Sequence, residues 1–163
     1  MVLMGLPDAQ GATLKRALWV PKEVDDAFTG QAGFIDFADP RFAGLLQRYI
    51  AGTYVSGTLH GDPKKYRPDF ERLLNIDEVW VMCFRSPKIN QWRLMGRFTQ
   101  KDEFISLGFY QRGYLDGEKK YHSVAQTFLT RWQSLCGGAS FLRGSKIQDY
   151  ISMPVSDPYV PII

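Results

Sequence analysis

The sequence has little of what disulfide-rich, metal-binding or membrane-spanning proteins need. It contains two cysteines and two histidines in 163 residues, and their spacing predicts neither a disulfide framework nor a structural metal. The longest apolar run is far shorter than the roughly 20 residues of a membrane span. The N-terminus also lacks the charged and apolar regions of a signal peptide. We therefore expect a cytoplasmic protein with no metal, no cofactor and no membrane contact.

Positive charge is concentrated in the second half of the chain. The net charge is +3, but residues 83–146 contain eleven Lys and Arg against four Asp and Glu, whereas residues 1–82 and 147–163 are each net acidic. This distribution is typical of a surface that binds phosphate groups. It fits a solvated basic surface equally well.

The order of the expected elements predicts an α+β fold. Strand-like composition or alternation favours strands at 16–20, 92–98 and 103–110, and a run that is apolar on both faces favours a central strand at 79–84. Helical spacing, a Pro near each of the first two helix starts and Gly137 after the last helix favour helices at 21–28, 40–50 and 117–136. Residues 53–68 are expected to form a loop. We predict a small antiparallel or mixed sheet, with N-terminal helices and a C-terminal helix packed on one face.

The chain is expected to form one domain over residues 1–146, followed by a tail over residues 147–163. The tail contains three prolines among several apolar residues. Apolar side chains of this kind are not left wholly in water. The tail is therefore either an extended strap across the domain or a segment that binds a partner.

Alternation along two of the strands separates apolar from polar side chains. One face is expected to carry core residues, namely Trp92, Leu94, Phe98, Ile105, Leu107 and Phe109. The opposite, open face is then expected to carry Arg85, Arg93, Arg97, Ser106, Tyr110 and Arg112. Guanidinium groups bind phosphate and tyrosine rings stack on unpaired bases, so this face favours single-stranded RNA.

Three short segments resemble the RelE/HigB superfamily of small bacterial toxins. They are the strand around Trp80, the step Trp92-Arg93-Leu94, and Gly108-Phe109 with Arg112. The resemblance covers roughly residues 16–136 and implies a RelE-like fold. Cys83 and Gln111 stand at positions that are usually basic in the family.

The resemblance implies the toxin of a type II toxin–antitoxin system. Such a protein is a ribosome-dependent endoribonuclease that cleaves mRNA by attack of a ribose 2′-OH on the adjacent phosphate. Its partners are mRNA on the ribosome and a cognate antitoxin, whose acidic segment would cover the basic face. The implied catalytic residues are Arg93, Arg112 and Tyr110, and the implied RNA-binding residues are Arg85, Arg97, Tyr114, Lys119, Lys120 and His122.

Two alternatives remain open on the sequence alone. The departures at Cys83 and Gln111 favour a non-catalytic protein on the same scaffold, of phage or mobile-element origin, that binds RNA or another protein. Each candidate side chain also has a purely structural interpretation. The arginines would form surface ion pairs, the tyrosines would lie at the rim of the core, and the lysines and His122 would form a solvated helix start.

Overall fold

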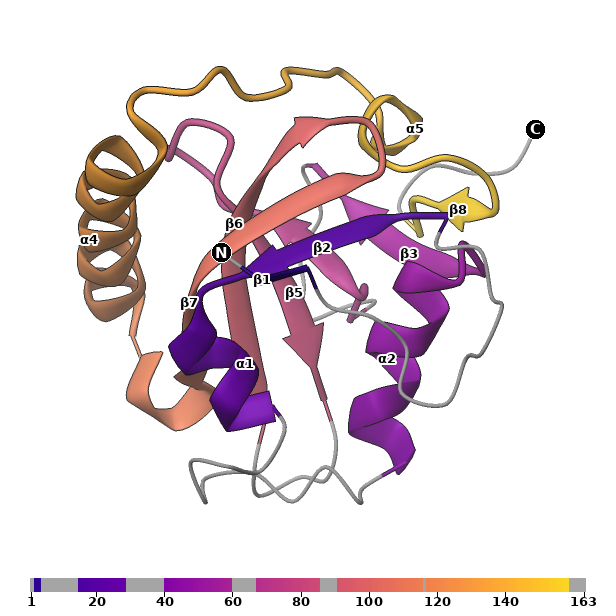
Figure 1. Ribbon diagram of the computed structural model, residues 1–163, viewed down its shortest axis with the longest axis horizontal. Helices are drawn as coiled ribbons and strands as arrows, with labels where there is room; N and C mark the ends of the chain where they lie inside the picture. Colours follow the sequence, from indigo (N-terminus) through magenta and orange to yellow (C-terminus); the bar gives the residue numbers. More distant parts are fainter. Residues whose placement is uncertain are drawn as a thin grey trace.

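The computed structural model describes residues 2–3, 15–28, 40–59, 67–85, 91–115 and 117–158, which form an α+β fold. One mixed, curled sheet has the strand order β1-β2-β7-β6-β5-β4-β3-β8 (Figure 1). Its strands are β1 (Val2–Leu3), β2 (Ala17–Val20), β3 (Val55–Thr58), β4 (Phe70–Arg72), β5 (Trp80–Phe84), β6 (Trp92–Gln100), β7 (Glu103–Gln111) and β8 (Val155–Ser156). The helices are α1 (Lys22–Phe28), α2 (Pro40–Ile50), the 3₁₀ turn η1 (Arg112–Leu115), α4 (Glu118–Cys136) and α5 (Ile147–Tyr150).

The middle of the sheet confirms the predicted elements. The apolar run of β5 is buried at every position, as expected of a central strand. It pairs antiparallel with β6, and β6 forms a hairpin with β7. The three predicted helices are present as α1, α2 and α4, and Gly137 ends α4 in the left-handed conformation. The first of the predicted strands is present as β2, which lies parallel to β7.

The predicted sheet was too small. Within the expected loop at 53–68, Val55–Thr58 forms β3, which pairs with β4 on one side and with β8 on the other. Its sequence, Val-Ser-Gly-Thr, contains a single apolar residue, so alternation does not reveal it. The strand forms because the neighbouring strands satisfy its backbone groups.

Two cores lie on opposite faces of the sheet, and Figure 1 shows α4 and α2 on opposite sides of it. On the first face, α2, α5 and the C-terminal segment cover a core rich in aromatic rings, including Trp80 and Phe98. On the second face, α4 places Val124, Phe128 and Trp132 against the sheet. The spacing of these three residues by four positions is why α4 presents one apolar stripe.

The expectation of one open polar face is therefore wrong. Residues 93–98 of β6 are all buried. On the face that was expected to be open, α4 covers Met95 and Arg97, whereas Arg93 lies in the pocket beyond the helix. The assignment of Ile105 and Leu107 to the core beside Leu94 is also wrong. The register of β7 shifts by one residue opposite Met95 and Gly96, so both side chains join the α4 core while Phe109 stays on the first face.

The segment after α4 packs on the domain over its described length. It crosses one end of the sheet (Figure 1) before forming α5 and β8. Ile147, Tyr150, Ile151 and Val155 are buried in the first core. Residues 159–163 of the predicted tail lie outside the described residues.

Arg16 connects this segment to the start of the sheet. Its guanidinium group donates to the carbonyl oxygens of Thr53 and Ser152 at 2.9 and 2.7 Å and forms an ion pair with Asp102 at 3.3 Å. The Arg16 side chain is fully buried. Four segments that are distant in sequence are thus joined through one charged group.

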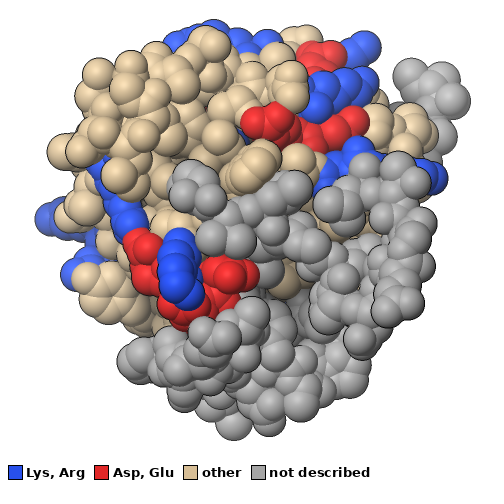
Figure 2. All heavy atoms as spheres, in the orientation of Figure 1, with Lys and Arg blue, Asp and Glu red and all other residues tan. Residues whose placement is uncertain are grey.

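The surface carries charges of both signs in small groups. Figure 2 shows acidic and basic side chains together around α1, where Lys22 pairs with Asp26. Among the described residues, no helix is both long enough and apolar enough to cross a membrane. Five arginines line a pocket on the second face.

Candidate functional site

An open pocket of about 830 Å³ lies on the second face, beside the N-terminal end of α4. Its wall comes from the ends of β5 and β6, from β4 and the β4–β5 connection, from η1 and from the first turn of α4. Five arginines line it, namely Arg67, Arg72, Arg85, Arg93 and Arg112. This volume suits a small organic ligand and exceeds what a single phosphate group needs.

Strand pairing explains why several of these arginines lie together. Cys83 of β5 lies opposite Arg93 of β6, so their side chains share the second face. Arg85 follows Cys83 by two positions and therefore has the same orientation. Arg112 begins η1 directly after β7, and its backbone N–H donates to the carbonyl oxygen of Gln91 at 2.6 Å.

Arg93 is buried, with 4% of its surface exposed, and it is held by neutral oxygen atoms. Its guanidinium group donates to the carbonyl oxygens of Trp92 at 2.9 Å and Phe84 at 3.4 Å, and to Oε1 of Gln91 at 3.4 Å. Among the described residues, these partners leave its positive charge uncompensated by a direct ion pair. A buried cation of this kind favours an anionic ligand.

Arg85 is fixed differently, by an ion pair with Glu71 and by donation to the carbonyl oxygen of Pro68 at 2.7 Å. The pair lies beside Cys83. Burial, reinforced by the charge of Glu71, raises the pKa of the Cys83 thiol to about 12. The thiol therefore stays protonated at neutral pH, and Cys83 acts as a small buried residue beneath the pocket.

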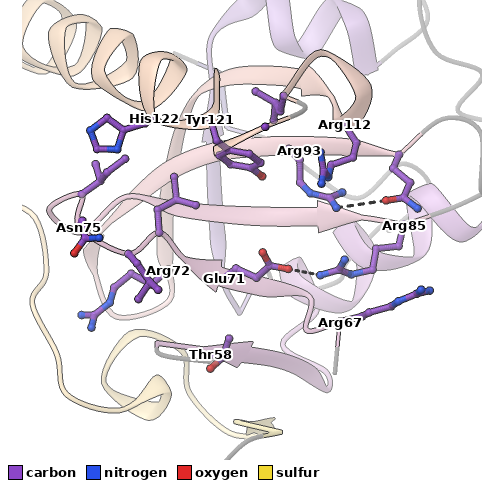
Figure 3. Close-up of a pocket in the computed structure, with 16 residues that line it drawn as sticks. Thr58, Arg67, Glu71, Arg72, Asn75, Arg85, Arg93, Arg112, Tyr121 and His122 are labelled. Atoms are coloured by element: carbon purple, nitrogen blue, oxygen red, sulfur yellow. Dashed lines mark hydrogen bonds and ion pairs between the residues drawn. The ribbon is translucent and has the colours of Figure 1, made fainter. Parts of the chain in front are cut away.

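Tyr121 of α4 supplies a phenol to the pocket. Figure 3 shows its hydroxyl pointing toward Arg93. Burial raises the pKa of Tyr121, although Arg93 and Arg112 act in the opposite direction. The phenol is therefore a proton donor at neutral pH, placed beside the arginines.

The structure brings together four of the predicted site residues: Arg85, Arg93, Arg112 and His122 all line the pocket. Arg67, Arg72, Glu71 and Tyr121 line it as well and were not predicted. Tyr121 was assigned to the apolar stripe of α4, and helical spacing alone does not show that the stripe passes the end of the sheet. Arg67 and Arg72 belong to segments in which no face was predicted.

Arg97 was expected on the same open face as Arg93 but lies under α4 and outside the pocket. It is 5% exposed, and its guanidinium group stacks on Phe141 at 3.9 Å and donates to the carbonyl oxygen of Asp77 at 2.7 Å. Burial lowers the pKa of Arg97, against the opposing charge of Asp77. The group is thus part of the packing between α4 and the β4–β5 connection.

Tyr110, Tyr114 and Lys120 also lie outside the pocket lining. Tyr110 folds over Gly108, where a Cβ atom would lie 2.5 Å from its ring. Its ring is parallel to that of Tyr114 at 6.4 Å, and Lys120 Nζ lies 4.2 Å from the centre of the Tyr114 ring. These side chains partner one another. Lys119 is exposed on α4 and does not line the pocket.

Comparisons of the chain with protein-family models, with curated proteins and with solved structures found no match. In the described part of the chain, no three His, Cys, Asp or Glu side chains are grouped as metal ligands. The side chains that line the pocket define its chemistry. Fixed guanidinium groups with an adjacent phenol can bind a phosphate diester, stabilise added negative charge on it, and supply one proton.

Proposed function

We propose that the protein binds single-stranded RNA in this pocket and cleaves it, as a ribosome-dependent endoribonuclease toxin related to RelE and HigB. The arginine pocket around Arg93 carries the proposal, because a buried cation held by neutral oxygens is suited to a phosphate. The element order also supports it. The strand β2, the helices α1 and α2, the antiparallel strands β5–β7 and the helix α4 follow one another in the order that the resemblance implies, although β3 and β4 lie between α2 and β5.

The proposed reaction is an intramolecular transesterification. The ribose 2′-oxygen forms a bond to phosphorus while the bond from phosphorus to the 5′-oxygen breaks, which leaves a cyclic phosphate and a free 5′-hydroxyl. Arg93 and Arg112 stabilise the charge of the phosphorane, and Arg85 and Arg67 hold the flanking phosphates. Tyr121, in place of Tyr110, protonates the departing 5′-oxygen, and the 2′-hydroxyl proton passes to water.

The partners in this proposal are mRNA on the ribosome and an antitoxin. An acidic segment of the antitoxin would enter the pocket and occupy the arginines in place of phosphate. Binding and neutralisation would then depend on the same side chains. Both would weaken with rising salt, because the contacts are electrostatic.

One observation favours the non-catalytic alternative. Glu71, which lines the pocket, is engaged with Arg85 and is therefore not positioned to accept the 2′-hydroxyl proton. A protein that lacks such a base but keeps the arginines would bind RNA or an acidic protein without cleaving RNA. The two functions differ in whether messages are cut.

Induced expression in a bacterial host tests the proposal. We expect wild-type protein to arrest growth and to leave cut messages with new 5′-hydroxyl ends. Arg112→Ala and Arg93→Met should each lower the cleavage rate on translating ribosomes by about 100- to 1000-fold, the usual cost of losing one such donor. Arg143→Ala is the matched control, because Arg143 is exposed and pairs with Asp77 outside the pocket lining.

Two results would contradict the proposal. If both pocket variants cleave as fast as the Arg143 variant, the assigned site is wrong. If the wild type binds RNA through Arg93 but cuts no message on translating ribosomes, the non-catalytic alternative replaces it.

A further inference from the structure

The two ends of the pocket differ in chemistry. Figure 3 shows Arg67, Arg85, Arg93 and Arg112 at one end, with Arg72, Asn75 and His122 at the other. The charge of Arg72 is paired with Glu78 at 2.9 Å. Asn75 belongs to the β4–β5 connection, whose residues Leu73, Leu74 and Ile76 also line the pocket. A site that bound phosphate alone would have no use for the second end.

Leu74 is the most exposed of the apolar side chains in this wall, at 63%. Single exposed leucines are ordinary on protein surfaces. This one differs because it lines a concave site together with Ile76 and Leu115, which are buried. A ligand in the pocket would cover its exposed surface.

The β4–β5 connection that carries Leu74 is fixed from several directions. The backbone N–H of Leu73 donates to the carbonyl oxygen of Val79 at 2.8 Å. Arg72 forms an ion pair with Glu78 at 2.9 Å, and the Tyr150 hydroxyl of α5 donates to the same carboxylate at 2.7 Å. The wall is therefore formed before a ligand arrives, which lowers the cost of binding.

We infer that the pocket holds a nucleotide in one direction, with its phosphate among the arginines and its base against Leu74 and Ile76. The base lies flat on the apolar wall, as bases do between apolar side chains in other nucleotide pockets. The Asn75 amide and the His122 imidazole offer donors and acceptors to the base edge. This inference rests on the proposed function, since it assumes that the arginines bind phosphate.

Binding of two small probes tests the base site. Adenosine 5′-monophosphate and ribose 5-phosphate share a sugar and a phosphate and differ in the base. We expect the wild type to bind the first at least about tenfold more tightly in calorimetric titration. Leu74→Ser should remove most of this difference and leave the affinity for ribose 5-phosphate unchanged.

The matched control is Leu135→Ser, because Leu135 is 57% exposed on α4 and does not line the pocket. It should change neither affinity. Arg93→Met should lower both affinities by about the same factor, since it acts on the shared phosphate. Inorganic phosphate should bind no more tightly than ribose 5-phosphate.

The outcomes separate the inference from the proposed function. If both sugar phosphates bind equally well and depend on Arg93, the base site is wrong and the phosphate site stands. The base site is also wrong if Leu74→Ser and Leu135→Ser have the same effect on adenosine monophosphate. If neither probe binds the wild type, the phosphate site fails, and the proposed function fails with it.

Discussion

The first face of the sheet is covered along its length by α2, α5 and the C-terminal segment, whereas α4 covers only part of the second face. Aromatic rings fill the first core, where Trp80 contacts Phe98 and Tyr150 at centroid distances of 5.5 and 4.7 Å. On the second face, the end of the sheet that α4 leaves uncovered carries the arginine pocket. One sheet thus carries a closed core on one side and an open pocket on the other.

The largest effect should come from the first face. Trp80→Ala removes a fully buried indole from the aromatic core, and we expect the free energy of unfolding to fall by about 3–5 kcal/mol. Trp92→Ala should cost less, because Trp92 is half-buried and stacks chiefly on Phe109 at 4.5 Å. Denaturant unfolding of both variants measures the difference. Equal losses would show that the two ends of the first core contribute alike.

A smaller effect is expected on the second face. Arg93→Met keeps an unbranched side chain of similar length and removes a buried charge, so the free energy of unfolding should change by less than about 1 kcal/mol. RNA binding by the same variant should be lost, which nitrocellulose filter binding would measure. A stability loss as large as that of Trp80→Ala would make Arg93 part of the core and not of a site.

The smallest effect concerns alkaline pH. Burial raises the pKa of Cys83 from 9.0 to about 12 and that of Tyr150 from 10.0 to about 12. Both groups stay protonated in the folded and unfolded chain below about pH 9, so their full contribution to stability is present there. As pH rises further, the unfolded chain loses these protons first, and stability falls toward pH 12.

Because the unfolded pKa of a thiol is lower, the decline from Cys83 begins about one pH unit before that from Tyr150. Melting temperatures of wild type and Cys83→Ala, measured from neutral pH upward, test this. We expect the variant to lose less stability than the wild type between about pH 9 and pH 10. Identical slopes in that window would mean that the Cys83 thiol gains access to solvent.

Much of the fold followed from local patterns in the sequence. The continuous apolar run of β5 and the four-residue spacing of Val124, Phe128 and Trp132 each predict one element and its buried face. The short strand β3 has no such pattern, and it depends on β4 and β8, which come from elsewhere in the chain. Pairing of this kind is a tertiary effect that local propensity does not contain.

The candidate site was predictable only in part, for a related reason. Strand alternation placed Arg93 and Arg97 on one face, which is correct. It does not show which part of that face α4 covers. Arg97 lies under the helix and Arg93 beyond it. The one-residue shift at Leu107 also puts Ile105 and Leu107 on the opposite face from Phe109, and a bulge has no reliable signature in a single sequence.

The buried Arg16 has a consequence for the order in which the chain can fold. Synthesis delivers the N-terminal part of a protein first, yet one acceptor for this guanidinium group is the carbonyl oxygen of Ser152, 136 positions later. Until this segment has left the ribosome, the Arg16 guanidinium group lacks one of its native hydrogen-bond acceptors. The residues of α5 that cover the first core are also missing. The native fold is therefore completed only after the segment around Ser152 has left the ribosome. Any activity that depends on the complete fold would begin only after that point.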